Sequence, residues 1–197
     1  MRVVETKVFT FAELSNSAKE VALENNRDIN THFDWYEPIY EGFKEQAEEA
    51  GFQVEDMYFS GFYSQGDGAM FTYCGFNDTL LNNFVDQLDL SEEDKVILRS
   101  QGVVSGKGLH RGNYYHEKSC EHHVWLESNN PDWEYATDLI SQHEDAFDKY
   151  VIKTYEDLCG ELYGDLREYH EELTSDDYVA ERLIDSEYEF TGSGQTF

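Results

Sequence analysis

The feature that most restricts the fold is the aromatic-rich stretch of residues 52–76, which is interrupted by the polar run SQGDG at 64–68. Extended apolar segments on both sides of a glycine-bearing turn are typical of an antiparallel hairpin. Residues 103–127 have the same character, with a turn expected near 117–120. Two such hairpins predict a core built on one antiparallel sheet.

Helical periodicity occupies much of the remaining chain. Apolar residues recur at spacings of three to four, which predicts helices with one apolar face. Gly160 and Gly164 are expected to divide the last of these helices in two, because glycine is a poor helix former. The expected helices span roughly residues 16–30, 35–50, 77–88, 91–102 and 131–173.

Together these patterns predict an α+β fold. We expect an antiparallel sheet of about four to five strands, helices packed on one face of it, and a long acidic C-terminal helix or helical hairpin. A single domain is expected over residues 1–191, with its acidic helical section at about 131–185 and a flexible tail at 192–197. A first strand is expected at 3–9 and a last one at 186–191.

The charge balance excludes one broad class of function. Fourteen Lys and Arg face 42 Asp and Glu, which gives a net charge of -28. Such a chain repels phosphate backbones, so general DNA or RNA binding is not expected. The three cysteines do not suggest a disulfide framework, and the sequence has no apolar run typical of a signal peptide or a membrane span. We therefore expect a cytoplasmic protein.

The turn at 64–68 is the first candidate site. Ser64, Gln65 and Asp67 place a hydroxyl, an amide and a carboxylate beside glycines whose backbone N–H groups are accessible, which suits a small polar ligand or a sugar–phosphate. Alternatively, the run is only a hairpin turn that requires glycine conformations.

The second hairpin is locally basic. Residues 95–121 contain five Lys and Arg but only two acids. These basic side chains suit the binding of an anionic ligand, although a strand face exposed to solvent explains the same charges. The ligand-binding residues of this interpretation are Ser64, Gln65, Asp67, His110, Arg111, Tyr115 and His116.

No motif predicts catalysis, a metal or a cofactor. The sequence contains no GxSxG, P-loop, CxxC or HExxH pattern. The histidines and cysteine between 110 and 123 are close in sequence, but neighbouring strand residues point to opposite faces and cannot all meet one zinc ion. Catalytic residues are therefore not assigned, and an enzyme is the less favoured class. We expect Cys74 and Cys159 to be buried thiols.

The third feature is the acidic C-terminal section. Residues 131–187 contain 18 Asp and Glu against four Lys and Arg. Carboxylates three to four residues apart on a helix resemble the regular negative charge of a duplex, but a solvated helix face has the same pattern. The partner-binding residues of the first interpretation are Glu144, Asp145, Asp148, Asp157, Glu161, Asp165 and Glu168.

The run SGFYSQGDGAMF, with the preceding LSNSAKEVALENNRDIN and DWYEPIYEGFKEQAEEAGFQVEDMYF, resembles a group of small tailed-bacteriophage proteins that carry an SGF(W/Y)SQGDGA motif. The resemblance covers roughly residues 8–76, and the HRGNYYHE region more weakly. It implies a phage origin and a role inside the infected host. It transfers no catalytic residues, because the group has no established activity.

Two functional hypotheses follow from these features. The leading one is an acidic interaction protein that inhibits a host nucleic-acid-binding defence protein in the host cytoplasm through DNA-like negative charge. The alternative is a nucleotide- or other small-ligand-binding or enzymatic domain, whose pocket forms where the SQGDGA turn meets the His/Tyr/Arg hairpin. An assembly role is a third reading, and the aromatic content is compatible with a homodimer.

Overall fold

The computed structural model describes residues 6–197, whose contacts form two compact units. One unit comprises residues 38–165. The other is formed by the described residues up to 37 together with residues 166–197. This division subdivides the single domain that the sequence predicts over 1–191. We call the two parts the sheet unit and the terminal unit, and describe each by itself.

The sheet unit is built on four antiparallel strands, which confirms the α+β class and the expected strand number. The two hairpins predicted from the sequence form its halves and meet in the middle through Tyr73 and Gly108. The spatial order follows the chain: β2 (Phe52–Ser60), β3 (Gly68–Phe76), β4 (Gly102–His110) and β5 (Cys120–Ser128).

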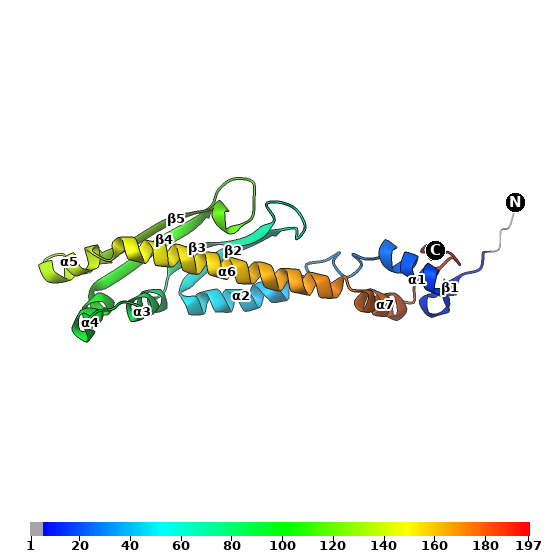
Figure 1. Cartoon of the computed structure of the whole chain (residues 1–197), viewed down its shortest axis with the longest axis horizontal. Coiled ribbons are helices and arrows are strands. Elements are labelled where there is room, and N and C mark those ends of the chain that lie inside the picture. The colour runs from blue at the N-terminus through cyan, green and yellow to red at the C-terminus, as the bar shows by residue number, and fades with distance from the viewer. Residues whose placement is uncertain (1–5) are drawn as a thin grey trace. The chain divides into compact units, whose positions relative to one another are not determined.

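Helices cover one face of this sheet (Figure 1). Phe71 of β3 packs against Phe43 and Tyr155 from two of them, with ring centroids 5.4 and 4.5 Å apart. A third helix joins the same layer through Phe84 and Phe147, whose centroids lie 5.2 Å apart. The helices are α2 (Glu37–Ala50), α3 (Asp78–Asp86), α4 (Glu92–Gln101), α5 (Glu134–Ser141) and α6 (Glu144–Leu173).

Two glycines of β4 make room for the aromatic core. A Cβ at Gly108 would lie 2.2 Å from Cε1 of Tyr73, and one at Gly106 would lie 2.6 Å from Cε2 of Phe76. The two rings therefore occupy the space that side chains of β4 would fill, which is a common reason for glycine inside a strand.

The long acidic helix is present, but its expected break is not. The structure shows α6 as one helix of 30 residues through Gly160 and Gly164, so the predicted interruption at these glycines was wrong. Apart from the backbone of the helix itself, nothing lies within 4 Å of the position that a Cβ would take at either glycine. The helical section instead breaks at residues 142–143, between α5 and α6.

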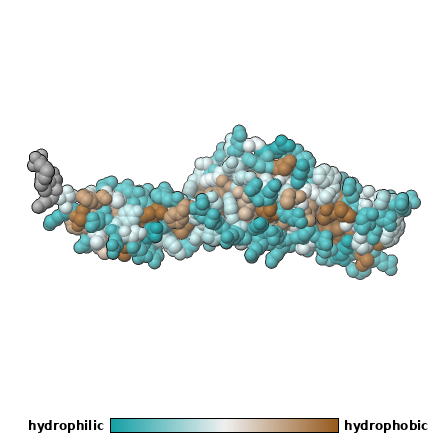
Figure 2. Space-filling view, turned by 180° about the vertical axis from the view of Figure 1, so that it is seen from behind, coloured by the Kyte–Doolittle hydropathy of each residue, from teal (hydrophilic) through white to brown (hydrophobic). Residues whose placement is uncertain are grey.

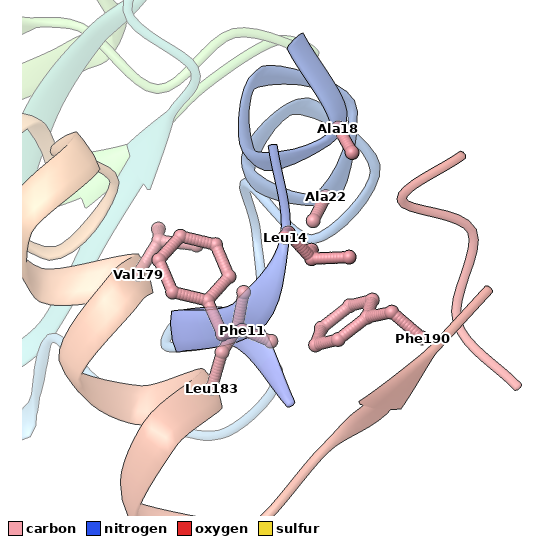
Figure 3. Close-up of a cluster of buried hydrophobic side chains, with 7 residues drawn as sticks. All are labelled: Phe11, Leu14, Ala18, Ala22, Val179, Leu183 and Phe190. Atoms are coloured by element: carbon pink, nitrogen blue, oxygen red, sulfur yellow. The ribbon is translucent and has the colours of Figure 1, made fainter. Parts of the chain in front are cut away.

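The terminal unit is closed by a two-stranded antiparallel pairing of Phe9 with Phe190 and Thr10 with Glu189. Phe11, Leu183 and Phe190 contribute to its buried core, in which both chain ends meet (Figure 3). The elements are β1 (Phe9–Thr10), the 3-10 helix η1 (Phe11–Glu13), α1 (Asn16–Asn25), α7 (Asp176–Asp185) and β6 (Glu189–Phe190).

The ends of the chain differ in part from their predicted structure. The strand expected at 3–9 lies partly outside the described residues, and β1 begins only at Phe9. At the other end, within the expected tail, the Phe197 N–H donates to the Glu189 carbonyl at 2.9 Å.

None of the described helices combines the length and apolar character needed to cross a bilayer. Hydrophobic residues on the face shown in Figure 2 form separate patches among hydrophilic ones.

Candidate functional site

The carboxylate of Asp67 closes the turn between β2 and β3. Its Oδ2 accepts the backbone N–H groups of Tyr63 and Ser64 at 2.9 and 2.6 Å. Gly66 completes the turn with φ of 95°, in the left-handed region that favours glycine. One oxygen of Asp67 is therefore occupied by its own turn. The side chains of Ser64 and Gln65 belong to exposed residues on the same turn.

The structure brings this turn against the loop between β4 and β5. A Cβ at Gly68 would lie 2.6 Å from Cβ of His116, and one at Gly66 would lie 3.4 Å from Cδ1 of Tyr114. The two segments that the sequence singles out are thus neighbours at one end of the sheet. Glycine at 68 permits this close approach, since any side chain there would displace the loop.

An aromatic stack occupies the same end of the sheet. Tyr58 and Tyr115 lie nearly parallel, with centroids 5.2 Å apart and planes inclined by 9°. His110 packs on both, at 5.6 Å from Tyr58 and 5.0 Å from Tyr115, and its Nε2 lies 3.1 Å from the Tyr114 carbonyl oxygen. Burial, followed by the charge of Asp56, raises the pKa of Tyr58. Sequence reasoning did not include Tyr58, because its stacking on Tyr115 depends on how the two hairpins pack.

The remaining members of the predicted ligand set already have protein partners. Arg111 forms an ion pair with Glu121 across the hairpin. Nδ1 of His116 accepts the backbone N–H of Lys118 at 3.1 Å and so caps a short 3-10 turn. An anion at this loop would compete with Glu121 for the guanidinium, which is exposed.

The seven predicted partner-binding acids all lie on α6 and are all exposed. They do not form one row. Asp157, Glu161 and Asp165 are four residues apart and lie on one stripe, each about 6 Å further along the axis. Glu144 and Asp148 instead line a cavity beside β5. Asp145 is exposed in the first turn of α6, and Glu168 lies on the part of α6 that belongs to the terminal unit.

Few cations lie near the stripe. Lys153 forms an ion pair with Asp157, and the amide of Gln46 on α2 donates to Glu161. Along its whole length α6 has ten acids and only three Lys and Arg, so most of its carboxylates face water without a basic neighbour on the helix. The negative charge predicted from the sequence therefore reaches the surface.

A partly buried polar cluster, which no motif in the sequence predicts, lies between the sheet and α6. The Tyr73 hydroxyl lies 3.0 Å from Nδ1 of His122, and Cys120 Sγ lies 3.9 Å from the same nitrogen. Burial raises the pKa of the Cys120 thiol to about 11 and that of Cys159 to about 12, and it lowers the pKa of His122. These are neutral core groups rather than activated ones.

The cysteines only partly follow the expectation. Cys159 is buried as predicted, whereas Cys74 is exposed on β3, so its predicted burial was wrong. Cys74 follows the buried Tyr73, and neighbouring strand residues point to opposite faces of the sheet. Within the described residues, no three or more His, Cys, Asp or Glu side chains are placed to hold a metal ion.

The sheet, its one-sided helical layer and the exposed carboxylates define an acidic α+β protein with two hairpin loops at one end of the sheet. Comparison with known families places it more narrowly. Residues 35–176 match the model of a domain of unknown function, DUF8835, and the chain belongs to this family. No curated protein and no solved structure matches the chain.

Proposed function

We propose that the protein is an acidic interaction protein, which binds the basic, nucleic-acid-binding surface of another protein by presenting carboxylates in place of phosphates. The observation that carries this proposal is the exposure of the acids on α6, where ten acids face three basic residues. The net charge of -28 adds a long-range attraction for any basic partner.

The spacing of the stripe supports the same proposal. Asp157, Glu161 and Asp165 rise by about 6 Å per step, and a single strand of duplex DNA carries one phosphate per about 3.4 Å. Carboxylates at this spacing can meet alternate arginines or lysines of a groove that normally holds a phosphate backbone. Inhibition then follows from occupancy, without any chemical step.

The resemblance to tailed-phage proteins suggests where such a partner is found. We propose that the protein acts in the cytoplasm of an infected bacterium and that its partner is a host defence protein that normally binds nucleic acid. Direct binding of DNA or RNA by this chain is disfavoured, because its own charge repels phosphates.

The test begins with capture of partners from a lysate of the bacterial host at low salt. The proposal requires that a nucleic-acid-binding protein is enriched, that duplex DNA competes with its capture, and that salt releases it. Capture that is insensitive to both DNA and salt would contradict the proposal.

A pair of charge-reversal variants then locates the surface. Changing Asp157, Glu161 and Asp165 to lysine is expected to weaken binding by roughly 10- to 100-fold, because like charges would then face the partner. The matched control reverses Glu41, Glu45 and Glu49, which are equally spaced and exposed on α2. Equal losses in both variants would mean that only net charge matters and that α6 is not the contact surface.

A second candidate function is binding of a small polar ligand, such as a nucleotide, where the two hairpin loops meet. The observation that favours it is the contact of Gly66 and Gly68 with the loop that carries Tyr114 and His116. Tyr114 is 61% exposed there, and the face of its ring away from His116 can stack on a base. Nucleotide titrations of the wild type and of Tyr114→Ala test this, with Trp133→Ala as an aromatic control away from the loops.

A further inference from the structure

We propose that the free edge of β5 accepts an extended, basic segment of the partner as a fifth strand of the sheet, with a Lys or Arg side chain entering the acidic groove between β5 and α6. This inference rests on the proposed function, since it names the part of the surface that a basic partner would bind. It adds backbone pairing to what would otherwise be attraction by charge alone.

The two edges of the sheet differ in a way that indicates this role. At the β2 edge, the register with β3 shifts between Val54 and Met57, and the irregular segment carries Glu55 and Asp56. Bulges and charges are the usual devices that stop an edge strand from pairing with another chain. The β5 edge has no bulge, because its nine residues pair with β4 in unbroken register. It contains no proline, and its two acids, Glu121 and Glu127, repel an acidic strand but not a basic one.

The outward backbone groups of β5 have no strand partner in the described chain, and α5 is the helix that packs closest to this strand. From residue 121 to 127, the described chain gives β5 no backbone hydrogen-bond partner other than β4. Alternate residues of an antiparallel edge strand point both N–H and C=O away from the sheet. These groups form a ready template for one more strand.

A groove runs along this edge. It has a volume of about 180 Å³, and four consecutive strand residues, 124–127, line it together with Glu144, Phe147 and Asp148 of α6. Consecutive strand residues point to opposite faces, so a groove lined by all four follows the strand edge itself. Glu144 and Asp148 are exposed and can bind the charged end of a lysine or arginine that enters the groove.

Charge decides between a basic partner and a second copy of this chain. Antiparallel pairing of two β5 strands about Val124 would place Glu121 of each copy opposite Glu127 of the other, and directly opposed like charges are destabilising. Two chains of net charge -28 also repel one another at a distance. An extended segment rich in Lys and Arg has the opposite charge and meets no such barrier.

The test uses a synthetic peptide of alternating valine and lysine, with the nine-residue length of β5, and the full-length protein. The control peptide has the same sequence with alternate backbone amides N-methylated, which keeps its charge but removes strand pairing. Hydrogen exchange of the β5 amides is followed by NMR. We expect alternate amides between 121 and 127 to exchange quickly in the free protein and to slow by at least about tenfold with the plain peptide only.

Two protein variants test the groove. The double variant Glu144→Gln, Asp148→Asn removes both charges of the groove. It should weaken binding of the plain peptide by at least about tenfold. The matched control, Glu156→Gln with Glu171→Gln, removes the same charge from exposed residues of α6 that do not line the groove, and should change binding by less than about threefold.

The possible outcomes separate this inference from the proposed function. Protection of β5 by the plain peptide, lost on N-methylation, supports strand addition. Equal binding of both peptides without protection of β5 overturns strand addition. This result would not contradict the proposal that the protein is an acidic interaction protein. If neither peptide binds at low salt, strand addition is also overturned, and the capture experiment alone then decides the proposed function. Dimerisation with protected β5 amides in the absence of peptide would show that a second copy is the occupant.

Discussion

The hydroxyl of Tyr155 on α6 binds both backbone groups of Phe71 in the central strand β3. It accepts the Phe71 N–H at 3.3 Å and donates to the Phe71 carbonyl at 2.8 Å. β3 and β4 pair at Tyr73 and Gly108, two residues along β3. The phenol of a helix thus supplies the partner that a neighbouring strand would supply in a regular sheet, and it ties α6 to the sheet by more than apolar contact.

Removing this hydroxyl tests its contribution to stability. Tyr155→Phe keeps the ring but leaves two buried backbone groups without a partner, so the free energy of unfolding should fall by about 1–3 kcal/mol. Urea denaturation measures the change. Tyr114→Phe removes a hydroxyl from an exposed residue and should alter stability by less than about 0.5 kcal/mol. A loss at Tyr155 no larger than at Tyr114 would show that water replaces the bond.

Gly108 should be among the least replaceable residues of the sheet. In Gly108→Ala the new Cβ would lie 2.2 Å from the Tyr73 ring and 2.8 Å from Cys120 Sγ, so the aromatic core must shift. Overpacking of this kind costs about 1–3 kcal/mol. The melting temperature should fall, and the near-ultraviolet circular dichroism of the aromatic core should change with it. A variant with an unchanged melting temperature would mean that β4 moves away freely.

The opposite result is expected on α6. Gly160→Ala places a methyl group in open space inside a continuous helix, and the free energy of unfolding should rise by about 0.5–1 kcal/mol. Thermal denaturation gives the sign directly. Destabilisation would indicate that the helix is not continuous at this glycine in solution.

Thiol reactivity should distinguish the three cysteines. Cys74 is exposed, whereas burial raises the pKa of Cys120 and Cys159 and suppresses their thiolates. A chromogenic disulfide reagent at pH 8 should modify one thiol quickly in the native protein and all three after unfolding. Cys74→Ser should abolish the fast phase. A second fast thiol would show that the cluster opens to solvent.

The same two thiols should make stability fall at high pH. Their pKa values are about 11 and about 12 in the folded protein, against 9.0 ordinarily, so the unfolded chain loses its protons first as the pH rises. Their contribution is complete below about pH 9 and is lost as the pH rises toward these folded values. Comparing denaturation at pH 8 and pH 10.5 for the wild type and Cys120→Ala should show a shallower decline in the variant.

Local patterns predicted the elements well, because each depends on residues near it in the chain. Apolar segments on both sides of the SQGDG run were enough for the first hairpin. The helix expected at 91–102 is present as α4, where the Ser91 hydroxyl caps the first turn by accepting the Asp94 N–H at 3.1 Å. The continuity of α6 was not predictable from Gly160, because propensity is overridden when one helix face is buried along its length.

The candidate sites were less predictable, because they depend on register and packing. The ligand-binding hypothesis placed the two loops together, but no local pattern encodes the contact of Gly68 with His116 that joins them. The polar cluster of Tyr73, Cys120 and His122 lies between the sheet and α6, whose residues are far apart in the sequence. For the acids, helical spacing alone indicated the stripe of Asp157, Glu161 and Asp165, but only the position of β5 shows that Glu144 and Asp148 line a groove.

The core of the terminal unit has a consequence for the order of folding. Phe11 and Ala18 come from one end of the chain and Leu183 and Phe190 from the other, so the sheet unit is an insertion within the sequence of the terminal unit. Closing so long a loop without prior structure is entropically costly and slow. Collapse of the sheet unit should shorten that loop, which predicts that the terminal unit folds in a late kinetic phase. Trimming either terminus should abolish this late phase and leave the folding of the sheet unit unchanged.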